Sequence, residues 1–473
     1  MRANPKGWFG RRAAWAIAAP AAIAALGWAP RAEAQTVDIP FIRGILPNGL
    51  IVILSEDHSV PQVAVNVSFS VGSRFERGGR TGFAHLFEHL MFMGTRRAPT
   101  RAFDAWMEGA GGRNNAWTAE DRTDYFDIAP PTALPLLLWL EADRMRDLGP
   151  LIDQAKLDLQ RDVVRNERRQ SIENRPYGVE ELELPKLLWP EAHPYHHPVI
   201  GSHGDLEAAL VGDVKDFFST WYDPANASIV VAGDFDPQEA RALVVNYFSS
   251  VPTRGKPQDP GAPGFSDEKS TLSGVVRQTV TDDVELAKVV LAWQSPRHFA
   301  AGDAELDLLA SVLSQGKGSR LYKALVYDQK IAQAVSARQE SHVLGSDFVV
   351  EALARPGVDP SKLERALFDQ IAQVRAAAVA ADELERARNG YEMDFVDRLQ
   401  SIPERASLLN AYQAELGDPG YAQRDLDRYR RASAADVLAV AKRVLLPDAV
   451  VSLTIIPRAA QKPEKAAAPE KGR

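Results

Sequence analysis

The chain of 473 residues contains no cysteine. This absence excludes disulfide bonds, thiol catalysis and thiolate metal ligands, as well as a lipid-modified N-terminal cysteine. Basic residues are also in deficit, because 55 Lys and Arg face 63 Asp and Glu and give a formal net charge of −8. Nucleic-acid binding needs a basic surface and is therefore not expected. No segment after residue 34 is long and apolar enough for a membrane span, so we expect none in the mature chain.

The N-terminal segment has the three-part order of a secretory signal peptide. A basic stretch at 1–12 precedes an Ala-rich apolar run at 13–29, and the small residues Ala32 and Ala34 follow. This order predicts a signal peptide over 1–34, cleavage before Gln35 and a periplasmic location. The alternative is an uncleaved membrane anchor, but the apolar run is short and Ala-rich for that role.

Strand and helix patterns recur in the same order in two halves of the chain. In the first half, strands are expected within 42–73, within 115–128 and near 228–232, and helices at 83–93, 102–108, 132–147, 153–174 and 237–248. In the second half, strands are expected within 275–293 and 335–353, and helices near 304–313 and from 361 onward. The recurrence predicts two similar domains from a diverged internal repeat.

The predicted boundaries follow from composition. The first domain is placed at 37–250 and the second at 269–458. The stretch 251–268 is rich in Pro and Gly and is expected to be a linker, and 459–473 lacks large apolar groups and is expected to be a disordered tail.

Two local patterns in the first half predict strands in detail. The sequence LPNGL at 46–50 is a hairpin turn signal. From Gln62 to Val71, valine and phenylalanine alternate with small or polar residues such as Asn66 and Ser68. A period of two predicts a half-buried strand.

The helix expected at 83–93, with Thr81 as a possible N-cap, carries a metal-binding pattern. His85 and His89 are four residues apart and Glu88 is three from His85, so all three share one helix face. Two imidazoles at this spacing can bind one Zn²⁺, which lowers the pKa of a bound water. Glu88 can then accept the proton as general base, which is the chemistry of the HxxEH arrangement.

Catalytic zinc takes three protein ligands, so a third is expected elsewhere. The charged helical stretch 157–170 is the candidate, with Val163 and Val164 on its buried side. Spacing alone leaves Asp162, Glu167 and Glu173 open.

Three motifs together resemble the pitrilysin or insulinase family of metallopeptidases: HLFEH at 85–89, NAWT at 115–118 and VVRNERR at 163–169. The resemblance runs from about residue 37 to 457 and is to the short-chain branch that includes mitochondrial processing peptidase. It implies an α+β fold of two similar domains, each an antiparallel sheet flanked by helices. It also implies that Glu167 is the third ligand and that one Zn²⁺ binds per chain. It also implies that Asn115, Ala116 and Trp117 form an edge strand on which peptides dock by strand addition.

The sequence departs from that family's pattern in two places. Gln160 stands where members often carry a glutamate that supports the metal site, so metal affinity or turnover could be lower. In the second half, the Arg and Tyr that bind substrate backbone are replaced by Val326 and Gln333, and Arg320 is expected to be structural. The resemblance therefore implies a homologous zinc-less partner subunit that supplies the Arg/Tyr pair, or else a homodimer.

These observations predict a zinc-dependent endopeptidase that hydrolyses extended or unfolded peptides, with Glu88 activating the zinc-bound water. The alternative is a non-catalytic binding or assembly subunit that retains the peptidase fold. His193, His196 and His197 lie among prolines and are expected to form a structured loop rather than a second metal site.

Overall fold

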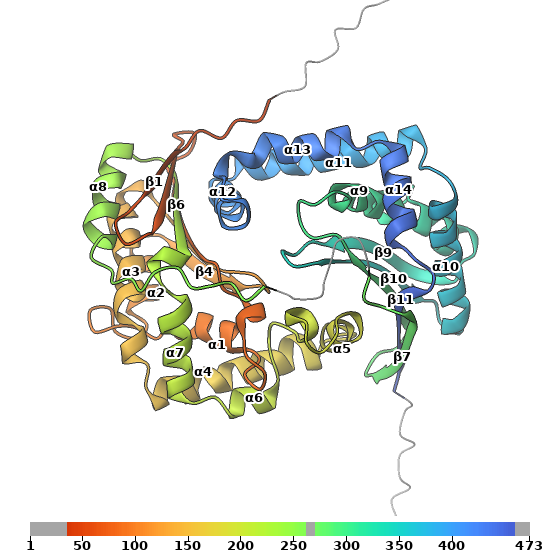
Figure 1. Cartoon of the computed structure of the whole chain (residues 1–473), viewed down its shortest axis with the longest axis horizontal. Coiled ribbons are helices and arrows are strands. Elements are labelled where there is room, and N and C mark those ends of the chain that lie inside the picture. The colour runs from red at the N-terminus through yellow and green to blue at the C-terminus, as the bar shows by residue number, and fades with distance from the viewer. Residues whose placement is uncertain (1–35, 262–269, 459–473) are drawn as a thin grey trace, which may run out of the picture. The chain divides into compact units, whose positions relative to one another are not determined.

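A computed structural model describes residues 36–261 and 270–458 of the chain (Figure 1). The expected signal peptide, the expected tail and residues 262–269 of the expected linker lie outside the described residues. From Asp38 onward the described chain forms one compact unit that contains two sheets. It is a two-domain α+β fold, as the sequence predicts.

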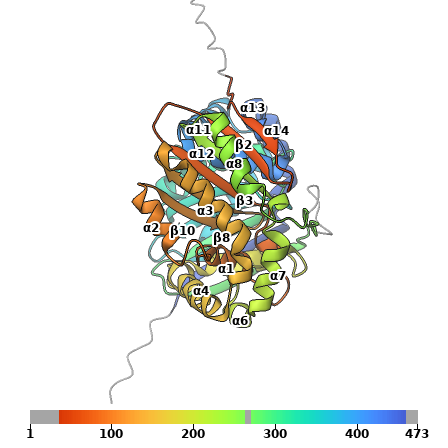
Figure 2. The same cartoon turned by 90° about the vertical axis from the view of Figure 1, so that its left-hand side faces the viewer.

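The first sheet has six strands in the order β1-β2-β6-β3-β5-β4. The strands are β1 (Ile42–Ile45), β2 (Ile51–Glu56), β3 (Val63–Phe69), β4 (Arg113–Thr118), β5 (Thr123–Ala129) and β6 (Ala227–Gly233). The helices of this half are α1 (Phe83–Leu90), α2 (Ala102–Gly109), α3 (Leu134–Asp147), α4 (Gln154–Glu167), α5 (Val179–Leu188), α6 (His203–Glu207), α7 (Val211–Trp221) and α8 (Pro237–Phe248). Helices α3 and α8 cover one face of this sheet (Figure 2).

The second sheet has five strands in the order β7-β11-β8-β10-β9. Its strands are β7 (Gly274–Asp282), β8 (Lys288–Ser295), β9 (Ala332–Glu340), β10 (Ser346–Ala354) and β11 (Ala449–Pro457). Its helices are α9 (Asp303–Ser314), α10 (Pro360–Ala376), α11 (Ala381–Gln400), α12 (Ile402–Leu416), α13 (Ala422–Arg431) and α14 (Ala434–Val444).

The sheets are mainly antiparallel, and each contains one parallel pair, β2 with β6 and β11 with β7. In both pairs a long stretch of chain separates the partners, as a parallel crossover requires. The closing strand β11 had no counterpart in the sequence prediction. The turn Leu46–Leu50 joins β1 to β2 as predicted, and Gly49 adopts a φ of +89° that favours glycine there.

Each sheet is covered in part by a helix from the other half of the sequence. Helix α12 packs on β3 and β6, and α5 packs on β11 and β8. In the second contact, Leu184 and Leu188 of α5 join Val290 and Val451 in one apolar cluster. The two halves therefore share their cores rather than meeting through the linker alone.

The packing of α12 on the first sheet corrects the prediction of a half-buried strand at 62–71. Every residue of β3 is buried, including Asn66 and Ser68 on its polar face. Asn410 of α12 covers that face and donates a hydrogen bond from Nδ2 to Oδ1 of Asn66 over 2.5 Å, while Ser228 of β6 donates to the Asn410 side chain. A buried polar face is stable only when its groups find such partners.

Candidate metal centre

A buried carboxylate holds the start of the helix that carries His85. Glu76 accepts hydrogen bonds from the backbone amides of Gly82 and Ala84 over 2.8 and 2.7 Å. These amides have no partner inside the helix, and a carboxylate at a helix N-terminus is favourable. Gly82 is the N-cap, with a φ of +87°, and a Cβ there would lie 2.7 Å from the carbonyl oxygen of Ile200.

Two details of the predicted helix are wrong. Thr81 does not cap α1; its hydroxyl donates to Asp205 over 2.5 Å and accepts from the amide of Ser202, which ties α1 to α6. The helix ends at Leu90 instead of 93, because Met91 already forms the C-cap.

His85 and His89 lie on the same face of α1, as their spacing predicts. Their Nε2 atoms are 3.3 Å apart, and their rings meet edge to face with centroids 4.8 Å apart. The opposite face of α1 is buried through apolar side chains such as Leu86, Phe87 and Leu90. Burial lowers the pKa of His85 to about 4, so its imidazole is neutral near pH 7, the form that binds metal.

Glu167 lies beside the two histidines. Its Oε2 is 3.2 Å from Nε2 of His89 and 3.8 Å from Nε2 of His85. The hydrogen bond with His89 lowers the pKa of Glu167 and favours the carboxylate. Glu167 is the last residue of α4, and a π-helical segment, Arg168–Glu173, follows it directly.

The other two acidic candidates lie elsewhere. Asp162 is exposed, and Glu173 accepts hydrogen bonds from Arg168 and His203. The predicted buried side of α4 is half wrong, because Val164 is fully buried whereas Val163 is 39% exposed. Val164 and Glu167 are three residues apart and share the inward side of the helix.

The three donor atoms are arranged as a tetrahedral metal ion requires. One ligand atom each from His85, His89 and Glu167 lies within 4.8 Å of the other two. Bonds of about 2.1 Å to tetrahedral zinc place neighbouring ligand atoms about 3.4 Å apart. The separations of 3.2, 3.3 and 3.8 Å fit that requirement, and two imidazoles with a carboxylate are a zinc-binding donor set.

Glu88 is buried next to these residues. Its side chain is on the same helix as the histidines and accepts a hydrogen bond at Oε2 from Oγ1 of Thr118 over 2.5 Å. Burial raises the pKa of Glu88, and the Thr118 hydrogen bond opposes the increase. A carboxyl group with a raised pKa is suited to accept and return a proton near neutrality.

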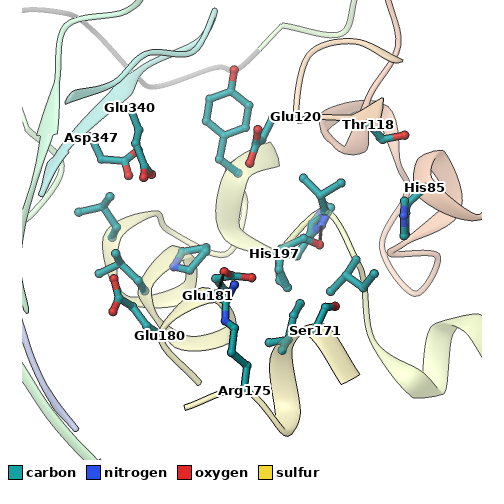
Figure 3. A pocket seen from close by; sticks show the side chains of 18 of the residues that line it. His85, Thr118, Glu120, Ser171, Arg175, Glu180, Glu181, His197, Glu340 and Asp347 are labelled. Carbon is teal, nitrogen blue, oxygen red and sulfur yellow. Dashed lines mark hydrogen bonds and ion pairs between the residues drawn. The ribbon is translucent and has the colours of Figure 1, made fainter. Parts of the chain in front are cut away.

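His85, Glu88 and Glu167 line a cavity of about 900 Å³. Figure 3 shows His85 on one side of it and Glu340 and Asp347 on the other. Strand β4 contributes Ala116, Trp117 and Thr118 to the lining. It is an edge strand. Among the described strands β4 pairs only with β5, which leaves its outer edge unpaired within that part of the chain, and Asn115 is exposed.

The residues at the positions that depart from the family pattern have different surroundings. Gln160 is half-buried and donates a hydrogen bond to Sδ of Met93 over 2.8 Å. Val326 packs in the second apolar core and Gln333 is exposed. Arg320 forms two hydrogen bonds with the carboxylate of Glu383, which agrees with a structural role.

The histidine-rich loop at 193–197 is structured, as predicted. His193 stacks on Trp189 at a centroid distance of 4.2 Å, and His196 Nδ1 lies 2.7 Å from the carbonyl oxygen of Trp189. Among the described residues, no group of three or more metal-ligating side chains includes these histidines.

Sequence reasoning missed two features of this region. Thr118 stands in the NAWT motif, but nothing in the motif indicates that its hydroxyl contacts Glu88. The cluster of Glu340, His342 and Asp347 comes from the β9–β10 hairpin, with His342 in the connection between the strands, and the short spacing from 340 to 347 is the signal that could have indicated it.

The chain is similar to known proteins in sequence and in fold. Residues 51–189 match the family described as Insulinase (Peptidase family M16), and residues 210–391 match the one described as Peptidase M16 inactive domain. The chain is 29% identical over 370 residues to the zinc protease PqqE of Helicobacter pylori, which covers 78% of this chain and 82% of the relative.

Two further similarities extend the comparison. Over 355 residues the chain is 24% identical to a probable mitochondrial-processing peptidase subunit beta of Arabidopsis thaliana, covering 73% of this chain and 65% of the relative. The crystal structure of a protease from Helicobacter pylori superposes with a TM-score of 0.80 at 25% identity, covering 89% of this chain and 100% of that one. Among the described residues, no helix has the length and apolarity to cross a membrane.

Proposed function

Because the chain belongs to the pitrilysin/insulinase family of peptidases, we propose that it is a zinc-dependent endopeptidase that hydrolyses extended peptides. The convergence of His85, His89 and Glu167 at distances suited to one metal ion carries the proposal. The name zinc protease borne by the Helicobacter pylori relative supports the identity of the metal.

Each residue has a distinct role in this proposal. His85, His89 and Glu167 hold one Zn²⁺, which when bound supplies Lewis acidity toward the substrate carbonyl and the attacking water. Glu88 accepts a proton from the water and passes it to the leaving amine. Thr118 orients the Glu88 carboxylate through their hydrogen bond.

Substrate is proposed to bind along the free edge of β4. Asn115, Ala116 and Trp117 would offer backbone groups to an extended peptide, as strand addition requires. Carboxylates outnumber Lys and Arg side chains in the cavity lining, so peptides with basic residues are favoured.

A partner subunit remains part of the proposal. Neither Val326 nor Gln333 supplies an Arg or Tyr, and Arg320 is engaged by Glu383. A homologous zinc-less subunit would supply the missing pair, and a homodimer is the alternative. The order of the segment 1–34 supports export to the periplasm.

The test is Glu88→Gln in the purified chain, with Glu108→Gln, an exposed residue of α2, as matched control. Glu88→Gln should keep stoichiometric zinc and lose peptide hydrolysis, whereas the control keeps both. Hydrolysis retained by Glu88→Gln would remove Glu88 from the mechanism. The mass and the activity of the purified chain, measured together, show whether a different subunit is needed. A fully active homodimer would show that no second gene product is required.

The second candidate function is a non-catalytic binding or assembly subunit. The lack of an Arg/Tyr pair at Val326 and Gln333, and the glutamine at position 160, favour it. Such a subunit would bind extended peptides without cleaving them and need not hold zinc, so zinc content of the wild-type chain separates the two functions.

A further inference from the structure

A second group of metal-ligating side chains lies in the wall of the cavity away from α1. Glu340 is the last residue of β9, Asp347 lies near the start of β10, and His342 lies in the connection between them. One ligand atom from each lies within 4.8 Å of the other two, and Nε2 of His342 is 3.9 Å from Oδ1 of Asp347. Figure 3 shows the carboxylates of Glu340 and Asp347 across the cavity from His85.

The other nitrogen of this imidazole faces a carboxylate from the first half of the chain. Nδ1 of His342 lies 3.5 Å from Oε2 of Glu120, in the connection between β4 and β5. The hairpin is held in place there, because the amide of Val343 donates to Asp121 and the amide of Leu344 donates to Tyr195, each over 3.0 Å. The cluster is therefore built from two anchored segments.

Asp347 is the member of the cluster whose negative charge is least compensated by its surroundings. The residue is only 7% exposed, and no amide, hydroxyl or cationic N–H of the described residues donates a hydrogen bond to its carboxylate. Buried carboxylates without donors are costly, so a proton or a cation must compensate them.

The nearby cations are already neutralised. Arg338 pairs with Glu340, but it also pairs with Glu180 and Glu351. Lys288 pairs with the same Glu180 and Glu351. These contacts leave Glu120 and Asp347 without a permanent positive partner among the described residues.

We propose that Glu340, His342 and Asp347 bind a second divalent cation of the zinc class, and that Glu120 orients the imidazole of His342 through its other nitrogen. One imidazole with carboxylates suits Zn²⁺ or Mn²⁺, whereas Ca²⁺ and Mg²⁺ prefer oxygen ligands alone. Ligand atoms around zinc lie about 3.4 Å apart, so His342 and Asp347 approach by about half an ångström on binding. The ion would hold Glu340 of β9 to Asp347 of β10, and the contact of Glu120 with His342 would connect this hairpin to the segment that follows β4.

The experiment is a zinc titration of the metal-free purified chain by equilibrium dialysis, with bound zinc measured by mass spectrometry. The wild-type chain should bind two zinc ions. His342→Gln and Asp347→Asn should each bind one, as should the double variant His85→Gln/His89→Gln. The control His298→Gln alters an imidazole that pairs with Glu415 and should still bind two.

A wild-type chain that saturates at one zinc overturns the proposal, and so does a second zinc retained by Asp347→Asn. The double variant His85→Gln/His89→Gln provides a readout that does not depend on the folding of the cluster variants. Saturating zinc should raise its melting temperature by roughly 2–4 °C. No increase in melting temperature would contradict the proposal.

Discussion

The hydroxyl of Thr118 donates a hydrogen bond to the carboxylate of Glu88 over 2.5 Å. Thr118 is the last residue of the edge strand β4, and Glu88 is in α1, thirty residues earlier in the chain. The strand proposed to hold the peptide is thus fastened to the carboxylate proposed to move the proton.

Replacement of Thr118 by valine should slow turnover while leaving the metal in place. A hydrogen bond to a charged group contributes about 1.5–3 kcal/mol, so kcat should fall by about 10- to 100-fold. Zinc content should not change, because Thr118 is not a ligand. Thr118→Ser keeps the hydroxyl and should stay near the wild-type rate; an equally slow serine variant would show that the methyl group matters instead.

Replacement of Glu167 by glutamine should weaken zinc binding. Loss of a direct carboxylate ligand should raise the zinc Kd by at least about 100-fold. This is more than the loss of most residues that only hold a ligand in place. Asp162→Asn and Glu173→Gln are matched controls on the same stretch of chain and should stay within about threefold of wild type. Competition with a chromophoric chelator measures the zinc Kd of all three variants. An equal loss of zinc affinity in the three variants would leave the third ligand unassigned.

Replacement of Asn410 by alanine should destabilise the fold. Its side chain is fully buried and satisfies Asn66 and Ser228 in the other half of the chain. Loss of one member leaves buried groups without partners, at about 2–4 kcal/mol in total. Asn389→Ala, on the exposed side of α11, should change stability by less than about 0.5 kcal/mol in the same urea unfolding experiment.

Asp307 should make stability depend on pH. Burial raises its pKa from 3.8 to about 7, and Tyr429 donates a hydrogen bond to it over 2.6 Å. Between these values the folded state binds more protons than the unfolded state, so stability falls as the pH rises through this window.

Asp307→Asn removes this titration and keeps an acceptor for Tyr429. The variant should therefore gain stability over wild type as the pH is raised from about 5 to 8, by on the order of 2 kcal/mol. Melting temperatures of both proteins across that range measure the difference. A constant difference at all pH values would show that Asp307 does not titrate in this window.

Local spacing was sufficient for part of the site. A helix has 3.6 residues per turn, so residues three and four apart share a face wherever the helix lies. His85, Glu88 and His89 needed no tertiary information to be grouped. The turn at 46–50 and the helix at 237–248 were likewise readable from local residues, because caps and turn residues act on their own neighbours.

Other features of the fold and of the site depend on which segments, far apart in the sequence, come into contact. Alternation in β3 indicates two different faces, but it does not indicate what covers the polar face; α12 does so from more than 300 residues away. Spacing likewise left three acidic residues open as the third ligand, and the register of α4 against α1 brings only Glu167 to the histidines.

The sequence by itself determined which chemical groups lie together on α1: two imidazoles and a carboxylate on one helical turn, in a chain without thiols. Tertiary structure decided the rest, because contacts between segments far apart in the chain leave no periodic trace in either one. It brought Thr118 to Glu88, Glu167 to His89 and Glu120 to His342. In each pair the local sequence of one element does not predict its contact with the other element.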